Sequence, residues 1–105
     1  MSKLYEKYLQ LKKENNNTIY LFKSGIFYIS IQEDAEFLAN EFSFKITNLN
    51  EEITKCGFPQ TRLGYYIQRL QEKNIKFQII DPKYEKVQNN EDYINNENIK
   101  RIINE

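Results

Sequence analysis

The sequence contains no histidine and a single cysteine, Cys56. One cysteine cannot form an internal disulfide, and without histidine there is neither a Cys/His metal set nor a Cys–His nucleophile pair. Histidine is also the most common general base at neutral pH, so its absence counts against acid–base catalysis. We therefore expect no enzymatic activity, no metal site and no cofactor. We expect Cys56 to be a buried, inert thiol.

The chain also lacks an excess of either charge, since 15 Lys and Arg residues balance 15 Asp and Glu residues. Modules that bind duplex DNA usually carry a basic excess, so this balance counts against tight electrostatic binding. One acidic cluster stands out, at Glu33, Asp34 and Glu36. It falls where a helix is expected to begin, and acidic side chains there interact favourably with the positive end of the helix dipole. This position favours a structural role over a catalytic one.

Long apolar runs are missing as well. The uncharged, apolar-rich runs, such as Thr18–Phe22, are far too short to cross a bilayer, and no apolar signal segment follows Met1. We therefore expect a cytoplasmic protein without membrane contact. A length of 105 residues corresponds to one domain, large enough to bury a core of its own.

Apolar residues recur at helical spacing in three segments. They predict a first helix from Leu4 to the Asn15–Asn17 turn, a second over Gln32–Phe42 and a third over about Gln60–Lys73. Asn74 follows the third helix, where a left-handed cap is wanted and asparagine tolerates that conformation.

Two β-rich segments, Thr18–Lys23 and Ile26–Ile31, are separated by Ser24 and Gly25 and predict a hairpin. Neither segment alternates cleanly between apolar and polar residues, because apolar residues occupy both odd and even positions. This pattern is typical of strands covered on both faces, so we place the two strands at the centre of the sheet. Shorter strands are expected at Phe44–Thr47, Ile53–Cys56 and Ile75–Ile80, and Gly57–Pro59 is interpreted as a turn. The predicted fold class is α/β (α+β), with a mixed sheet of about five to six strands flanked by helices.

The character of the chain changes after Pro82, where Asn, Glu and Lys predominate. We therefore predict a folded domain over 1–82 and a polar C-terminal extension over 83–105. Tyr93 and a few isoleucines could anchor a loosely docked helix at about Glu91–Asn104.

Several of these segments, in this order, resemble domain I of the MutS family, the N-terminal mismatch-recognising domain. The matching segments are the helix Tyr8–Lys12, the hairpin Leu21–Ile29, the acidic start Glu33–Ala35, the Cys56–Pro59 segment and the Tyr66…Leu70 helix. The similarity runs from about Tyr5 to Ile80 and implies the fold of that domain.

In that family a Phe-x-Glu motif meets the mismatched base: the phenylalanine stacks on it and the glutamate hydrogen-bonds to it. Phe27 matches the phenylalanine, but Ile29 stands where the glutamate is expected, and isoleucine can neither donate nor accept a hydrogen bond. Phe27 is either an exposed wedge that stacks on a base or a core aromatic. Phe58 has the same two alternatives.

The resemblance implies DNA as the partner, contacted through Phe27, Ile29 and Phe58 and through the basic residues Lys23, Lys55 and Arg62. The sequence contains no Gly-x-x-x-x-Gly-Lys-Ser/Thr phosphate loop, so we expect no ATPase activity and no nucleotide cofactor. The predicted function is that of a stand-alone accessory protein, such as one of a mobile element, that binds deformable, bulged or mismatched DNA. The alternative is a protein-interaction module that keeps the fold and has lost DNA binding.

Overall fold

The computed structural model describes residues 2–82 and 86–88, with the backbone alone at 86–88. The order of its elements is α1 Lys3–Glu14, β1 Ile19–Ser24, β2 Phe27–Ile31, α2 Gln32–Phe42, β3 Thr47–Asn48, β4 Thr54–Pro59, the 3₁₀ turn η1 Gln60–Arg62, α3 Leu63–Glu72, β5 Phe77–Asp81 and β6 Lys86–Gln88. The C-terminal helix predicted at about Glu91–Asn104 lies outside the described residues.

Within the described residues, six strands form one mixed sheet in the order β3-β4-β2-β1-β5-β6, in which β1 and β5 run parallel and the other paired strands run antiparallel. The hairpin β1–β2 therefore occupies the two central positions, as the sequence predicts. The fold class is confirmed too. The sheet continues past Pro82, because β6 pairs with β5 from Ile79 to Asp81.

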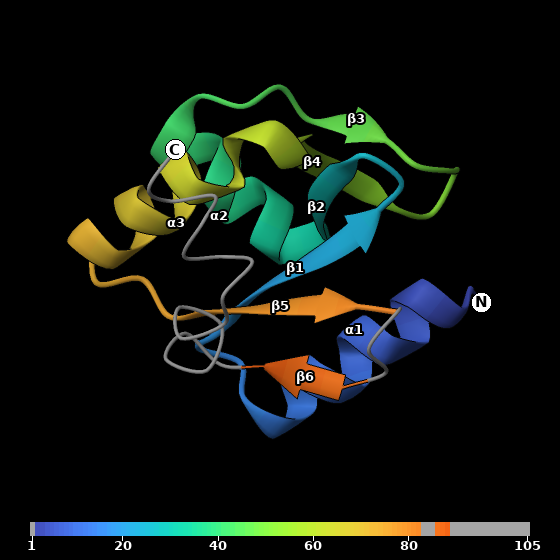
Figure 1. Cartoon of the computed structure of the whole chain (residues 1–105). Helices are drawn as coiled ribbons and strands as arrows, with labels where there is room; N and C mark the ends of the chain where they lie inside the picture. The colour runs from blue at the N-terminus through green and yellow to red at the C-terminus, as the bar shows by residue number, and fades with distance from the viewer. Residues whose placement is uncertain (1, 83–85, 89–105) are drawn as a thin grey trace.

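Helices cover both faces of the sheet (Figure 1), with α2 and α3 together and α1 apart from them. The apolar side chains that meet α2 and α3 are those of Ile19, Leu21, Tyr28, Cys56, Phe58, Phe77 and Ile79. Those on the α1 side are Tyr20, Phe22, Ile29, Ile31, Ile53 and Ile80. Successive strand residues point to opposite faces, so burial on both sides requires the nearly continuous apolar sequence of β1 and β2.

The helix ends follow their capping chemistry. Ser2 caps α1 by accepting a hydrogen bond from the Tyr5 amide at 3.1 Å. Asn74 adopts a left-handed φ of 58° immediately after the last turn of α3, and this prediction is confirmed. Ser43 takes the same conformation after α2, with a φ of 59°.

One predicted turn is wrong. Gly57, Phe58 and Pro59 are the last residues of β4 and pair with Ile29, Tyr28 and Phe27 of β2. The strand continues because the Phe58 ring is buried among the rings of Tyr28, Phe44 and Tyr66, and Pro59 stands only at its end. The short strand expected at Phe44–Thr47 is confined to Thr47–Asn48.

Candidate functional site

Phe27 is the first residue of β2 and follows the turn of the central hairpin. Gly25 makes that turn with a left-handed φ of 60° and open space around it. Ile26 is 62% exposed and Phe27 is 44% exposed. The alternative that places Phe27 in the core is therefore wrong, whereas its contact with DNA stays a prediction.

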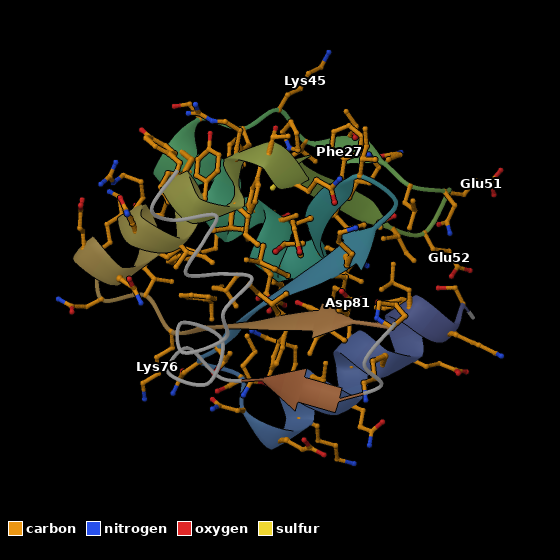
Figure 2. The ribbon with its side chains drawn as sticks, in the orientation of Figure 1. Phe27, Lys45, Glu51, Glu52, Lys76 and Asp81 are labelled. Atoms are coloured by element: carbon orange, nitrogen blue, oxygen red, sulfur yellow. The ribbon has the colours of Figure 1, made fainter. Side chains whose placement is uncertain are left out.

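A hollow of about 230 Å³ lies beside Phe27 on the same face of the sheet. Its lining comes from four neighbouring stretches of chain: Ser24, then Phe27 and Ile29, then Lys55, Cys56 and Gly57, then Lys45, Thr47 and Leu49. The pairings Ser24↔Phe27, Ile29↔Gly57 and Thr47↔Lys55 align these rows. Figure 2 shows Phe27 and Lys45 near each other, well apart from Lys76.

Gly57, which lines the hollow, has no room for a side chain. A Cβ at this position would lie 2.1 Å from the Tyr28 carbonyl oxygen and 2.9 Å from the Ile29 Cα, so β4 approaches β2 too closely for any other residue. Gly57 therefore contributes backbone alone to the lining of the hollow.

Ile29 has two roles in this arrangement. It is only 6% exposed and packs in the core cluster that includes Tyr8, Leu11 and Ile31, while it also lines the hollow. The position that carries glutamate in the MutS motif is therefore an apolar part of the lining, without a hydrogen-bonding group.

The predicted site residues divide into two groups. Phe27, Ile29 and Lys55 come together at the hollow. Lys23 and Phe58 do not, because the alternation of strand residues places them on the opposite face. Phe58 is 3% exposed, so its prediction as a DNA contact is wrong and its core alternative is correct.

The two remaining basic residues are held by aromatic rings. The Lys23 ammonium lies 5.7 Å from the centre of the Tyr28 ring and donates to the Gly25 carbonyl oxygen. Arg62 lies in η1, outside the hollow, with its guanidinium 4.4 Å from the centre of the Tyr65 ring. Neither residue lines the hollow.

Sequence reasoning missed six of the lining residues: Ser24, Lys45, Thr47, Leu49, Cys56 and Gly57. The signal was present in the spacing, since Lys45, Thr47 and Leu49 alternate by two, as do Lys55 and Gly57. Such alternation places residues on one face of a strand, but it does not say which strand will lie beside it.

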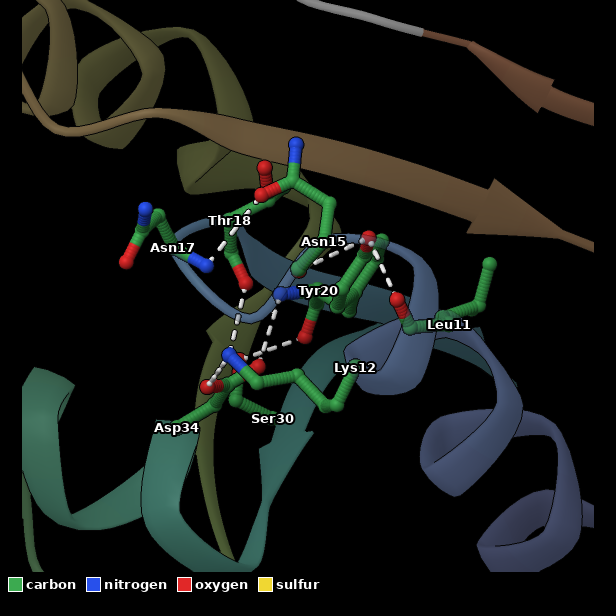
Figure 3. A network of polar contacts seen from close by, with 8 residues as sticks. All are labelled: Leu11, Lys12, Asn15, Asn17, Thr18, Tyr20, Ser30 and Asp34. Carbon is green, nitrogen blue, oxygen red and sulfur yellow. Dashed lines mark hydrogen bonds and ion pairs between the residues drawn. The ribbon is translucent and has the colours of Figure 1, made fainter.

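A buried polar network joins α1, β1, β2 and α2 (Figure 3). Asp34 is 2% exposed; its carboxylate accepts from the Lys12 ammonium at 2.7 Å and from the Tyr20 amide at 2.9 Å. Lys12 also donates to the Thr18 carbonyl oxygen at 2.8 Å. The Ser30 hydroxyl donates to the Tyr20 carbonyl oxygen at 2.8 Å. Burial raises the pKa of Asp34, and the hydrogen bond from Lys12 opposes that rise.

This network confirms the structural interpretation of the acidic cluster. Glu33 and Asp34 lie in the first turn of α2, as expected, and Glu33 is exposed. The Asp34 carboxylate bonds to Lys12 of α1 and to the Tyr20 amide of β1. Asp34 therefore stabilises the packing of α2 against these two elements.

The thiol of Cys56 is buried at the centre of β4 and donates to the Ala35 carbonyl oxygen at 3.2 Å. Burial raises its pKa to about 11. The thiolate, which is the reactive species, therefore forms only at strongly alkaline pH.

We expect Cys56 in the native protein to react with a disulfide reagent at pH 8 at least about 100-fold more slowly than free cysteine, since its thiolate fraction is lower by about two decades. The absorbance of the released thiolate measures the rate. Unfolding in guanidinium chloride should restore ordinary reactivity. A native rate equal to that of free cysteine would contradict the buried placement.

No group of three or more His, Cys, Asp or Glu residues in 2–82 is placed to hold a metal ion. None of the helices in this part of the chain has the length and apolar character needed to span a membrane.

Comparison with known proteins gives a consistent result. Residues 2–105 match the family model MutS domain I. The chain is 33% identical over 94 residues to the DNA mismatch repair protein MutS of Desulforamulus reducens, covering 82% of this chain and 11% of that protein. The MutS proteins of Macrococcus caseolyticus and Rickettsia prowazekii are 38% and 34% identical, over 72% and 76% of this chain and 10% and 9% of theirs. The chain thus spans about a tenth of the length of these relatives.

Proposed function

Because the chain belongs to the MutS domain I family, we propose that it is a DNA-binding domain for deformable, bulged or mismatched DNA. The observation that carries the proposal is the exposed Phe27 ring at the rim of a hollow that also contains two lysines. An exposed aromatic next to basic side chains suits insertion against a base, with contacts to the neighbouring phosphates.

The side chains of the proposed site suit binding. The 105 residues contain no phosphate loop, and the hollow combines stacking, apolar and cationic groups without a general base. Stacking of one base on an aromatic ring contributes about 1–3 kcal/mol. The formal net charge of zero adds little long-range attraction, so we expect binding to be modest and to weaken as salt is raised. Together with the DNA partner, we propose that the protein is located in the cytoplasm.

Replacing Phe27 with alanine is expected to weaken binding to a bulged duplex by about 1–3 kcal/mol, roughly one to two decades in Kd. The thermal unfolding temperature should change little, because the ring is 44% exposed. Gel shifts or fluorescence anisotropy at low and moderate salt measure the binding.

Phe37→Ala is the matched control, since Phe37 is 40% exposed but lies on α2, away from the hollow. It should leave binding unchanged. Equal losses in the two variants would contradict a specific role for Phe27. Failure of the unmodified protein to bind any DNA at low salt would favour the alternative function, a protein-interaction module.

A further inference from the structure

We propose that Arg62 binds a phosphate group of the DNA backbone and that the Tyr65 ring holds its guanidinium in position to do so. This inference rests on the proposed function and makes it more specific, because it adds a backbone contact outside the hollow. It is carried by a row of charged and aromatic side chains on η1 and α3, which we call the outer row: Arg62, Tyr65, Arg69 and Glu72.

The members of the outer row contact one another in sequence. They are three or four residues apart, so they lie along one side of the helix. At the far end the Nε of Arg69 donates to the Glu72 carboxylate at 3.0 Å. The Arg69 guanidinium lies 4.8 Å from the centre of the Tyr65 ring, and the Arg62 guanidinium lies 4.4 Å from the same centre. Glu72 therefore holds Arg69, and the ring of Tyr65 lies against both guanidinium groups.

The Tyr65 ring is anchored to the core although it is 44% exposed. It meets the ring of Tyr66 edge-on, with 5.0 Å between their centres. Tyr66 in turn packs against the buried ring of Phe58 at 4.5 Å. A long side chain loses rotamer freedom when it binds a partner, and a guanidinium that already lies on a fixed ring loses less of it. Arg62 is therefore pre-organised for binding.

The charge of Arg62 is also available to a partner. The charge of Arg69 is matched by Glu72, and Lys73 is paired with Glu41 at 3.6 Å. Within residues 2–82, Arg62 has no carboxylate partner, and its side chain is exposed. A guanidinium that lies over a ring keeps the N–H groups in its own plane accessible, and these suit bidentate binding of a phosphate.

Arg62 lies near the end of the sheet where the central hairpin turns. The Gln60 amide donates to the Ile26 carbonyl oxygen at 2.7 Å, which joins η1 to the hairpin. Arg62 follows Gln60 by two residues, a rise of about 4 Å in a 3₁₀ turn. Successive phosphates of one DNA strand are about 3.4 Å apart along the duplex axis. A duplex that meets the hairpin therefore brings a phosphate within reach of Arg62.

Arg62→Gln should weaken binding of the full chain to a matched duplex and to a duplex with one extrahelical base by the same factor, about tenfold. The factor is that of one hydrogen-bonded contact to a charged group, and phosphate contacts carry no information on the base. The slope of log affinity against log salt should become less steep by about 0.9, the value for one phosphate contact on duplex DNA. Fluorescence anisotropy with both labelled duplexes at several salt concentrations measures affinity and slope.

Lys76→Gln is the matched control for the loss of one positive charge. Lys76 is exposed, is not part of the outer row and lies far from Phe27 in Figure 2. Its replacement should leave both the affinity and the salt slope unchanged.

Three further variants separate the position of the guanidinium from its charge. Arg62→Lys keeps the charge and loses the planar group, so it should weaken binding to both duplexes about two- to fivefold with an unchanged salt slope. Tyr65→Leu should have the same effect, because a cation–π contact at an exposed site is worth about that factor. Tyr65→Phe keeps the ring and should bind as the parent does. Thermal unfolding checks that both Tyr65 variants are folded.

The outcomes separate this inference from the proposed function. Equal affinities and equal slopes for Arg62→Gln and the parent would overturn the phosphate contact and leave DNA binding intact. A loss confined to the bulged duplex would also overturn it, because it would mean that Arg62 contacts the base. A loss in Arg62→Gln without one in Tyr65→Leu would overturn the positioning role of the ring. No binding of the parent to either duplex at low salt would overturn the proposed function and this inference together.

Discussion

Replacing Lys12 with methionine is expected to lower the free energy of unfolding by about 3–5 kcal/mol at pH 7, because it leaves a buried carboxylate without its cationic partner. Asp34 is 2% exposed, and Lys12 holds it at 2.7 Å while also donating to the Thr18 carbonyl oxygen. Methionine keeps the apolar stem of the side chain and removes the charge. Denaturant unfolding followed by circular dichroism measures the loss.

The loss should depend on pH in a defined direction. Burial raises the pKa of Asp34 and the Lys12 hydrogen bond lowers it, so the pKa of Asp34 must rise further in the variant. A group with a raised folded-state pKa stabilises the fold at acid pH, and this stability is lost as pH rises above its unfolded pKa of about 3.9. The difference between the variant and the parent should therefore be largest at neutral pH and shrink towards pH 4.

Lys13→Met is the matched control, since Lys13 is the next residue of α1 and is exposed. It should change stability by no more than about 0.5 kcal/mol. Adding Asp34→Asn to Lys12→Met should recover part of the loss, because the unpaired charge is removed. If the two lysine variants were equally stable, Asp34 and Lys12 would not be coupled as the structure shows.

Gly57→Ala is expected to destabilise the protein by about 3 kcal/mol, because a Cβ at this position has no space. It would lie 2.1 Å from the Tyr28 carbonyl oxygen, and both contacting groups belong to the backbone of β2, which cannot move aside as a side chain can. Strand β4 would have to shift away from β2, and the hollow between Phe27 and Leu49 would change shape with it. Thermal and denaturant unfolding measure the effect.

Gly25→Ala provides a control with a different physical cause. Nothing lies within 4 Å of a Cβ at Gly25, but its φ of 60° is left-handed, so alanine there costs about 1–2 kcal/mol in conformation alone. The Gly57 variant should be clearly the less stable of the two. The reverse order would mean that β4 can yield at little cost.

The helices and the central hairpin could be predicted because their signals are local. The second helix coincides with Gln32–Phe42 as predicted, since its apolar residues repeat at helical spacing. The two-sided apolar pattern of β1 and β2 correctly predicts burial on both faces and therefore the centre of the sheet. Asn74 adopts the left-handed cap that its side chain tolerates.

The composition of the candidate site was decided by the tertiary structure. Local sequence gave Gly57–Pro59 the character of a turn, whereas burial of Phe58 against three other aromatic residues keeps these residues in β4. The exposure of Phe27 could not be decided from an apolar strand pattern, because it depends on where α1 stops covering that face of the sheet.

The sequence by itself determined the fold class, the family resemblance and the candidate aromatic, Phe27. Only the tertiary structure placed Lys45 and Leu49 beside Phe27, moved Lys23 and Phe58 to the opposite face, and joined Lys12 to Asp34. The physical reason is that helical and strand periodicity acts between near neighbours in the chain. Strand order and register depend on packing between residues that are distant in sequence, and a shift of one residue exchanges the two faces of a strand.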